Sequence, residues 1–206
     1  MLYMYSFCIY YSIQIMDHKH IYFADGSSLL QQQVEKNILK ELSHYNQQEL
    51  IKLLNSDAPF QSLFVDYEHP YVERLYLPGD KYRLSLHKIL PHDWTIQDSL
   101  YHRHDYPTGI KIFDGMYKME SGYSPNELEP ENACTSYYNS WSMYIMTDPN
   151  QWHRIKHIDW PSYSMMITGP KFRREKTNRP SKKQYPLGAE RIQGLKNEFL
   201  DILQSA

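Results

Sequence analysis

The sequence predicts an all-β core with helices at both ends. Tyr82, Leu84 and Leu86 alternate with polar residues, which is the period of a half-buried β-strand. Further strand-like segments lie at 109–119, 136–147, 153–158 and 162–168, and turn signals rich in Pro, Gly, Asp and Asn separate them. The composition agrees, because 19 tyrosines, 12 prolines and 8 glycines favour strands and turns.

Helical spacing of apolar residues frames these strands. Ser27 and Ser28 are candidate N-caps for a helix whose apolar positions run from Leu29 to Leu42. Asn46 is a candidate cap for a second, shorter helix. One more amphipathic face near the C-terminus predicts a third helix, with Ile192, Leu195, Phe199 and Leu203. We expect the apolar stripes to face the core and the first two helices to cover the sheet.

The composition indicates a single globular domain. Its 206 residues are enough to bury a core, and 41% hydrophobic and 22% charged residues are ordinary values. The net charge of −2 favours no nucleic-acid partner. Two cysteines far apart are not a disulfide framework, which is typical of a reducing compartment, so we predict a cytoplasmic protein.

Four segments follow from these patterns. The first begins with an apolar, aromatic stretch, residues 1–15, which is shorter than the roughly 20 residues of a membrane-spanning helix, so we expect no membrane role. Translation from Met16 is an alternative for that segment. The run Lys171 to Lys183 has no interleaved ladder of aromatic residues and is interpreted as a solvated basic linker. The segments are a tail or edge strand (1–26), N-terminal helices packed on the barrel (27–70), a β-barrel (71–172), and the linker with a C-terminal helix (173–206).

His102, His104 and His153 form the most specific constellation in the chain. Side chains alternate along a strand, so His102 and His104 point to the same face. A third imidazole from a later strand completes a facial metal site that leaves coordination positions open for substrate or oxygen. The alternative is that the three histidines only hydrogen-bond inside the barrel.

Other histidines and aromatic residues lie near this constellation in the sequence. His157 has the same strand parity as His153 and is a fourth ligand, a supporting group or, the reading we favour, a satisfied strand histidine. His87 and His92 could face the cavity, but we assign both to surface or turn positions. The neighbouring aromatic residues either line a pocket or pack in the core: Tyr101, Tyr106, Tyr117 and Trp152.

Two segments resemble the motifs of the cupin family. His102, His104, Thr108 and Gly115 have the spacing of the first motif, which reads His-x-His, Glu, Gly. The stretch from 148 to 157 is similar to the second motif, with His153 on its histidine, Asn150 on its turn glycine and His157 on its final Asn. Asn is the residue best able to replace Gly at positive φ. The resemblance covers roughly 71–172 and implies a double-stranded β-helix, or jelly-roll, barrel.

The position of Thr108 narrows this resemblance. Most metal-binding cupins have a glutamate ligand there, and a three-histidine site without it resembles the thiol dioxygenase branch, which includes cysteine dioxygenase. Residues 71–77 resemble the stretch of that branch whose arginine pairs with the substrate carboxylate, which implies this catalytic role for Arg74. The branch implies Fe(II), although zinc, nickel or manganese also suit three imidazoles.

The last predicted strand departs from that branch. The thiol dioxygenases carry Ser, His and Tyr at alternate positions, where this chain has Ser164, Met166 and Thr168. The chain also resembles cupin-like proteins without an assigned substrate. We therefore expect an Fe(II) dioxygenase acting on a small molecule such as a thiol carboxylate, with a homodimer left open. The alternatives are a non-catalytic metal- or ligand-binding cupin and a metal-independent cupin isomerase.

Overall fold

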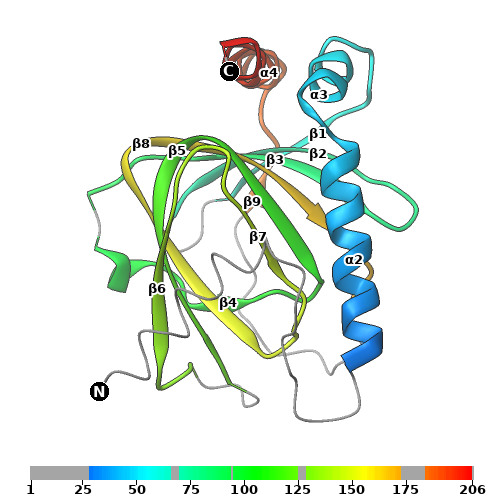
Figure 1. The fold of residues 1–206 in the computed structure, drawn as a ribbon. Helices are drawn as coiled ribbons and strands as arrows, with labels where there is room; N and C mark the ends of the chain where they lie inside the picture. The colour runs from blue at the N-terminus through cyan, green and yellow to red at the C-terminus, as the bar shows by residue number, and fades with distance from the viewer. Residues whose placement is uncertain (1–27, 66–69, 94, 125–128, 173–183, 206) are drawn as a thin grey trace.

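One antiparallel sheet dominates the computed structural model, which describes residues 28–65, 70–93, 95–124, 129–172 and 184–205. Its main path runs β6-β5-β8-β3-β2-β1-β9, while β4 pairs with β8 and β7 pairs with β5. The sheet curls on itself, and the helices pack outside it (Figure 1). The predicted all-β core with helices at both ends is confirmed, and the antiparallel sheet curls on itself as a barrel requires (Figure 1).

The strands and helices have the following bounds. The strands are β1 (Gln61–Val65), β2 (Val72–Leu77), β3 (Arg83–Ile89), β4 (His102–Arg103), β5 (Thr108–Tyr123), β6 (Ala133–Tyr138), β7 (Met143–Met146), β8 (Gln151–Thr168) and β9 (Gln184–Tyr185). The helices are α2 (Ser28–His44), α3 (Gln47–Leu54), the short 3₁₀ helix η1 (Ile96–Asp98) and α4 (Ala189–Ser205). The segment predicted as N-terminal helices therefore also contains strand β1.

The two longest strands, β5 and β8, pair along almost their whole length and bend together. The register shifts twice between Ile112 and Met116, around Gly115, which has a φ of +83°. A Cβ on Gly115 would lie 2.7 Å from the carbonyl oxygen of Pro161, so glycine is required where the strands cross closely. This bend lets the two separately predicted strands 153–158 and 162–168 continue as the single strand β8.

A tight turn divides the segment 136–147, which the sequence predicts as one strand. Ser142 donates its backbone N–H to the Asn139 carbonyl at 3.0 Å, and its hydroxyl donates to Asn139 Oδ1 at 2.7 Å. Trp141 in this turn has a φ of 71°, which few non-glycine residues adopt. The chain therefore reverses between β6 and β7, and each strand pairs with a different part of β5.

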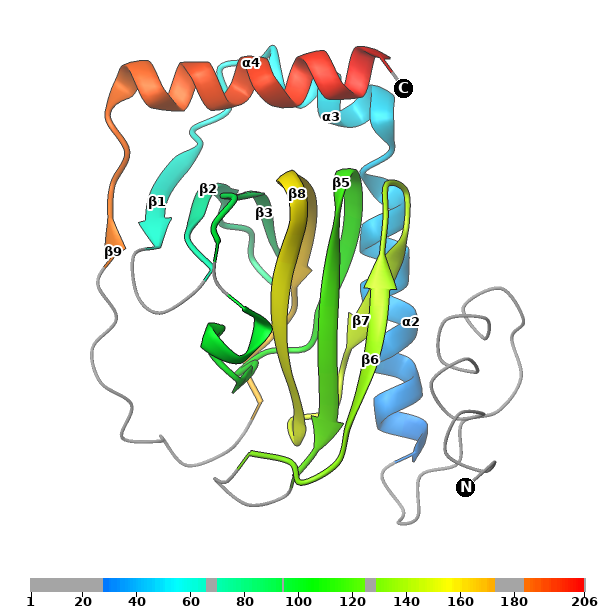
Figure 2. The ribbon, with the colours of Figure 1, turned by 90° about the vertical axis from the view of Figure 1, so that its left-hand side faces the viewer.

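The three predicted helices all form and cover the outer face of the sheet (Figure 2). Asn46 caps α3, because its side-chain oxygen accepts the backbone N–H of Glu49 at 3.0 Å. The helices and strands share an outer apolar cluster made of Ile38, Leu42, Leu50, Leu54, Leu75, Leu84, Leu86, Phe113, Met165, Ile167, Leu195, Phe199 and Leu203. The apolar stripes read from the sequence are therefore core-facing, as predicted.

Polar contacts on this outer face are paired. Glu198 on α4 accepts hydrogen bonds from Lys88 at 2.7 Å, from Tyr163 at 2.9 Å and from Arg191 at 2.7 Å. Arg191 also binds Glu73 on β2 with two nitrogens. Burial acts to raise the pKa of Glu198, but the hydrogen bonds from Arg191, Lys88 and Tyr163 outweigh it and lower that pKa to about 2. This ion network fixes α4 to β2, β3 and β8.

The inner face of the sheet carries a second apolar cluster. Its members are Ile89, Ile110, Ile112, Tyr117, Met119, Tyr138, Tyr144, Met146 and Met166, with Val72 and Ile155 packed against them. Tyr117 donates its hydroxyl proton to the Tyr144 hydroxyl at 2.9 Å, which satisfies two buried polar groups. Because alternate residues of a strand share a face, these residues define which other side chains point inward.

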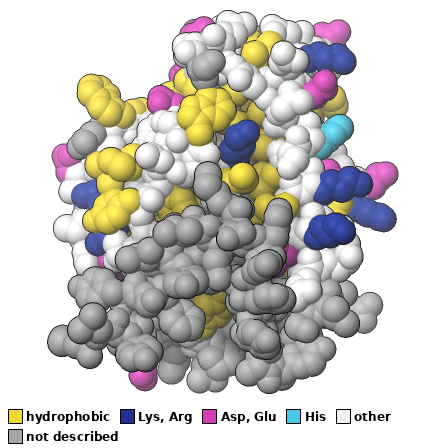
Figure 3. All heavy atoms as spheres, in the orientation of Figure 1, with side chains coloured by type: hydrophobic (Ala, Val, Ile, Leu, Met, Phe, Trp, Pro, Cys, Tyr) yellow, Lys and Arg dark blue, Asp and Glu magenta, His cyan; other side chains and the backbone are white. Residues whose placement is uncertain are grey.

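The described surface carries mixed charges. Basic and acidic side chains lie side by side along the upper right edge of the described surface in Figure 3. Among the described helices, none is long and apolar enough to cross a membrane. The expectations for the tail 1–26, for a start at Met16 and for residues 173–183 of the basic linker fall outside the described residues.

Candidate metal centre

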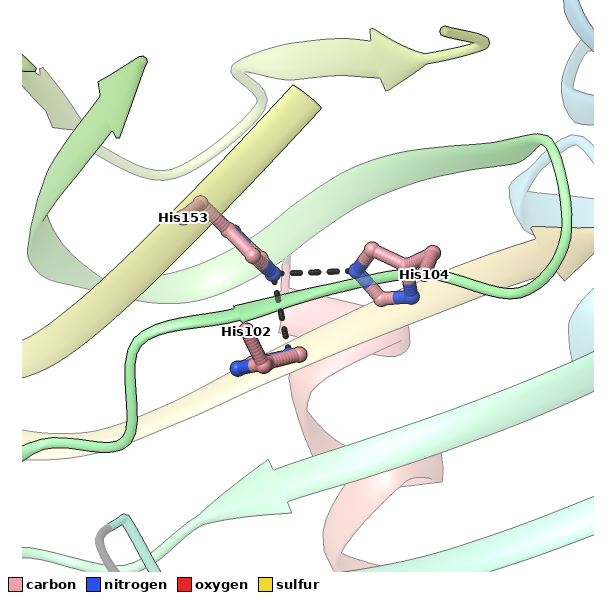
Figure 4. Close-up of side chains that lie close together, drawn as sticks. All are labelled: His102, His104 and His153. Carbon is pink, nitrogen blue, oxygen red and sulfur yellow. Dashed lines mark hydrogen bonds between the residues drawn. The ribbon is translucent and has the colours of Figure 1, made fainter. Parts of the chain in front are cut away.

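The structure brings the three predicted histidines together. His102 on β4 is directly opposite His153 on β8 in the antiparallel register, and His104 follows β4 by one residue. The Nε2 atom of His153 lies 2.9 Å from Nε2 of His104 and 3.2 Å from Nε2 of His102 (Figure 4). One ligand atom from each ring lies within 4.8 Å of the other two. The three rings therefore converge as predicted, although His104 lies just outside the strand on which the parity argument placed it.

The spacing of the three nitrogens fits a shared metal ion. Two imidazole nitrogens bound at about 2.1 Å from one metal and at right angles to each other lie about 3.0 Å apart. The observed separations of 2.9 and 3.2 Å match this arrangement. Hydrogen bonding alone does not account for both contacts, because the single Nε2 of His153 either donates one proton or accepts one. The donor set, three imidazole nitrogens, suits iron, zinc and other first-row metals.

The surroundings of the rings favour the neutral form that binds metal. His153 is 4% exposed, and burial, followed by the charges of His102 and His104, holds its pKa well below the usual 6.5. Nδ1 of His102 lies 3.1 Å from the Leu100 carbonyl oxygen, a contact that places a proton on Nδ1 and leaves Nε2 to face its neighbours. Nδ1 of His153 is buried with no hydrogen-bond partner among the described residues.

The remaining motif residues have structural roles. The Thr108 hydroxyl donates to the Tyr106 carbonyl at 2.9 Å, so it is satisfied locally. His157 accepts the backbone N–H of His92 on its Nε2 at 2.7 Å, which is the satisfied strand histidine that we favoured. The positive φ expected at Asn150 is wrong. Trp141 is the one non-glycine residue with a positive φ among the described residues, so Asn150 has a negative φ. An Asx turn replaces it, with Asp148 Oδ1 accepting the Asn150 N–H at 2.7 Å.

The surface or turn position assigned to His87 is also wrong. Its Nε2 is buried, and burial together with the nearby charges of Arg74, Arg83 and His104 holds the pKa of His87 well below the usual value. In the register, Arg74 on β2 is opposite His87, so both side chains are on the same face of the sheet. His92, by contrast, lies in the predicted turn and contacts the Tyr71 ring.

The aromatic residues near the motif pack in two separate places. Trp152 and Tyr101 stack with ring centroids 6.4 Å apart, and Trp152 neighbours His153 on β8, so it is on the opposite face. Arg154 lies over the Tyr101 ring and binds Glu120 at 2.7 Å. Tyr117 belongs to the inner apolar cluster. Tyr101, Tyr117 and Trp152 therefore pack in the core, which is one of the two alternatives that the sequence left open.

Comparison with known proteins adds weak similarities. No protein-family model and no curated protein sequence matches the chain. Hydroxypropylphosphonic acid epoxidase from S. wedmorenis is similar over 52% of this chain and 55% of its own, with 9% identity and a TM-score of 0.41. Drosophila melanogaster CENP-C bound to CAL1 is similar over 64% of this chain and 98% of its own, with 16% identity and a TM-score of 0.41.

A second solved structure, named Fe(II) HppE, is similar to the same extent. It has 10% identity and a TM-score of 0.41, over 54% of this chain and 56% of its own. The chain thus spans about half the length of the epoxidase structures that it matches. Similarities of this size carry no argument about function. The functional conclusion depends on the side chains of this chain.

Proposed function

We propose that the protein is an Fe(II)-dependent cupin oxygenase that acts on a small molecule, with a thiol carboxylate as the first substrate class to test. The observation that carries this proposal is that Nε2 of His102 and Nε2 of His104 both lie within 3.2 Å of Nε2 of His153. Three imidazoles on one face leave metal positions open on the other. When bound, iron would supply the redox chemistry with dioxygen, and the protein would position the substrate.

The protein residues divide this work. His102, His104 and His153 would hold the metal through their Nε2 atoms. Arg74 would bind the substrate carboxylate with two parallel N–H donors, which fix both the position and the direction of the group. Its place supports this role, because it is opposite His87, and His87 lies within electrostatic range of both Arg74 and His104.

A non-catalytic metal-binding module is the second candidate. The observation that favours it is Met166, which is 6% exposed and packs in the inner apolar cluster. In the thiol dioxygenases that the sequence resembles, a histidine stands at this position. A thioether does not move protons, so any activity of this protein would work without that relay.

Metal content is the first test. Elemental analysis of purified protein should find about one divalent metal per chain, and His102→Ala should abolish it. His157→Gln is the matched control, because His157 lies on the same strand face as His153 but outside the three-histidine group. Protein that takes up no metal when anaerobically supplied with Fe(II) contradicts both candidates and leaves the metal-independent isomerase.

Oxygen consumption separates the two metal-binding candidates. Iron-loaded protein is supplied with small thiols that carry a carboxylate and with matched thiols that lack it. A thiol dioxygenase consumes one dioxygen per thiol and places both oxygen atoms on sulfur as a sulfinic acid. Arg74→Gln should raise KM for the carboxylates and leave the matched thiols unchanged. Stoichiometric iron without oxygen uptake on any thiol contradicts the thiol oxygenase and supports the non-catalytic module.

A further inference from the structure

A row of polar side chains crosses the inner face of the sheet beside the candidate metal centre. Ser85 on β3 is opposite Met166, a member of the inner apolar cluster, so Ser85 also points inward. Arg83 and His87 are two residues to either side and share that face. Arg83 is opposite Thr168 on β8, and Thr168 is opposite Thr108 on β5. The row therefore spans three neighbouring strands.

The polar atoms of this row are buried and unsatisfied. Arg83 Nε, Ser85 Oγ, His87 Nε2 and Thr168 Oγ1 have no hydrogen-bond partner among the described residues. Ser85 is fully buried, and Thr168 is 5% exposed. An unpaired buried polar group costs about 1–3 kcal/mol, and folded proteins contain few of them. Several together on one patch indicate that a ligand supplies the missing partners.

The charge of the patch defines the kind of ligand. The Arg83 guanidinium lies 6.0 Å from the centres of the Tyr76 and Tyr106 rings, and Lys171 approaches the same Tyr106 ring at 6.0 Å. Within the described part of the chain, no ion pair joins Arg83 to an acidic side chain. Positive charge with unpaired N–H and O–H donors matches an oxyanion.

Backbone contacts hold this patch next to the metal ligands. The segment that follows His104 is tied to the end of β8, because Gly169 donates its N–H to the Pro107 carbonyl at 2.9 Å. A second bond joins the Phe172 N–H to the Asp105 carbonyl at 2.9 Å. Thr168 directly precedes Gly169, so a ligand at Thr168 and Arg83 lies close to the chain segment that carries His104.

We propose that Arg83, Ser85 and Thr168 form an oxyanion subsite beside the three histidines. The assignment of its ligand as substrate rests on the proposed function. The proposed function assigns one substrate carboxylate to Arg74, so with this subsite the substrate class is a small molecule with two acidic groups. The second group is a carboxylate, phosphate or phosphonate, which Arg83 binds by charge and the two hydroxyls bind by hydrogen bonds.

Anion binding to the full chain tests the subsite. Calorimetric titrations with inorganic phosphate and with malonate, at constant ionic strength, measure the dissociation constants. Arg83→Gln should weaken binding about 10-fold or more and Thr168→Val about 5-fold, values typical of charged and neutral hydrogen bonds. Arg154→Gln is the matched control and should leave binding unchanged, because Arg154 pairs with Glu120 and neighbours His153 on β8, so it is on the opposite face. Tighter phosphate binding assigns a phosphoryl or phosphonyl group, and tighter malonate binding assigns a carboxylate.

Metal measurements on the same variants separate the two proposals. Arg83→Gln should keep the metal content of the wild type, and His153→Ala should lose metal while retaining phosphate binding. Equal anion affinity in wild type, Arg83→Gln and Thr168→Val overturns the subsite even where metal binds. Binding that depends on Arg83 in a protein that takes up no metal supports the subsite while contradicting the proposed function. Circular dichroism of each variant verifies that it is folded.

Discussion

The two faces of the sheet differ in whether their buried polar groups have hydrogen-bond partners. On the outer face, Glu198, Arg191 and Glu73 are joined by hydrogen bonds, and the surrounding apolar cluster is closed by three helices. On the inner face, Ser85, Thr168 and His153 are buried; each has a polar atom without a hydrogen-bond partner among the described residues, and His153 Nε2 lies close to two other imidazole nitrogens. The contacts of the outer face therefore stabilise the fold.

The inner face contains buried polar atoms without a hydrogen-bond partner, which lower the stability of the fold. Unpaired buried groups destabilise a fold unless a ligand satisfies them, so they persist where a ligand is expected. The contrast is internal to each strand: on β3, Leu84 and Leu86 contribute to the outer cluster, while Arg83, Ser85 and His87 face inward. Substitutions on the two faces should therefore affect different properties.

Phe199→Ala should have the largest effect on stability. Phe199 is fully buried in the outer cluster and its ring centroid lies 5.4 Å from that of Tyr163. Truncation leaves a cavity and should lower the free energy of unfolding by about 3–5 kcal/mol, measured by urea denaturation. Metal bound per folded molecule should not change. A variant that remained folded but lost its metal would show that the faces are coupled.

His104→Ala should give the opposite pattern. Loss of one of three ligands should weaken cobalt(II) binding by about 100-fold or more, because even groups that only support a ligand change affinity by 10–100-fold. The unfolding free energy of the metal-free protein should stay within about 1 kcal/mol of the wild type. Competition with a chromophoric chelator measures the affinity. Unchanged affinity would remove His104 from the ligand set.

Glu198→Gln should destabilise the protein in a pH-dependent way. The pKa of Glu198 is about 2 in the folded protein, below the ordinary 4.5, so its contribution is fully present above pH 4.5 and lost as the pH falls toward 2. At pH 7 we expect a loss on the order of 1 kcal/mol after solvent screening, or about 2–4 °C in Tm.

The measurement is Tm of both proteins from pH 7 to pH 2, where the two curves should converge. Asp201→Asn is the control on the same helix, because Asp201 is exposed. A difference between wild type and Glu198→Gln that stays constant over this pH range would contradict the role of the ion network.

Ser85→Ala should have the smallest effect and the most informative sign. Ser85 is buried without a partner, so removing its hydroxyl should leave the unfolding free energy unchanged or raise it by up to about 1 kcal/mol. Ser62 is the matched outer residue, because its Oγ accepts the Leu187 N–H at 3.0 Å. Ser62→Ala should lower stability by about 1 kcal/mol. Thermal denaturation of both variants measures the two changes in stability. Equal losses of stability in Ser85→Ala and Ser62→Ala would contradict the difference between the two faces.

Local patterns predict most of the secondary structure of this chain. The helix start at Asn46, the strand alternation from Arg83 onward and the buried face of α4 are all encoded by residues within a few positions of one another. The spans of the strands are less predictable. β8 runs through Pro161 as one strand because Gly115 on its partner permits a close crossing, and that contact joins residues far apart in sequence.

The sequence by itself predicted which residues form the candidate metal site. His102 and His104 share a face through strand parity, and His153 follows a turn at the spacing of a known motif, so three residues named the site. Strand alternation places Arg83, Ser85 and His87 on one face, but only the tertiary structure decided that this face points inward and that Thr168 joins it. Their positions depend on the register between β3 and β8, which nonlocal pairing and sheet curvature set, and no local pattern records it.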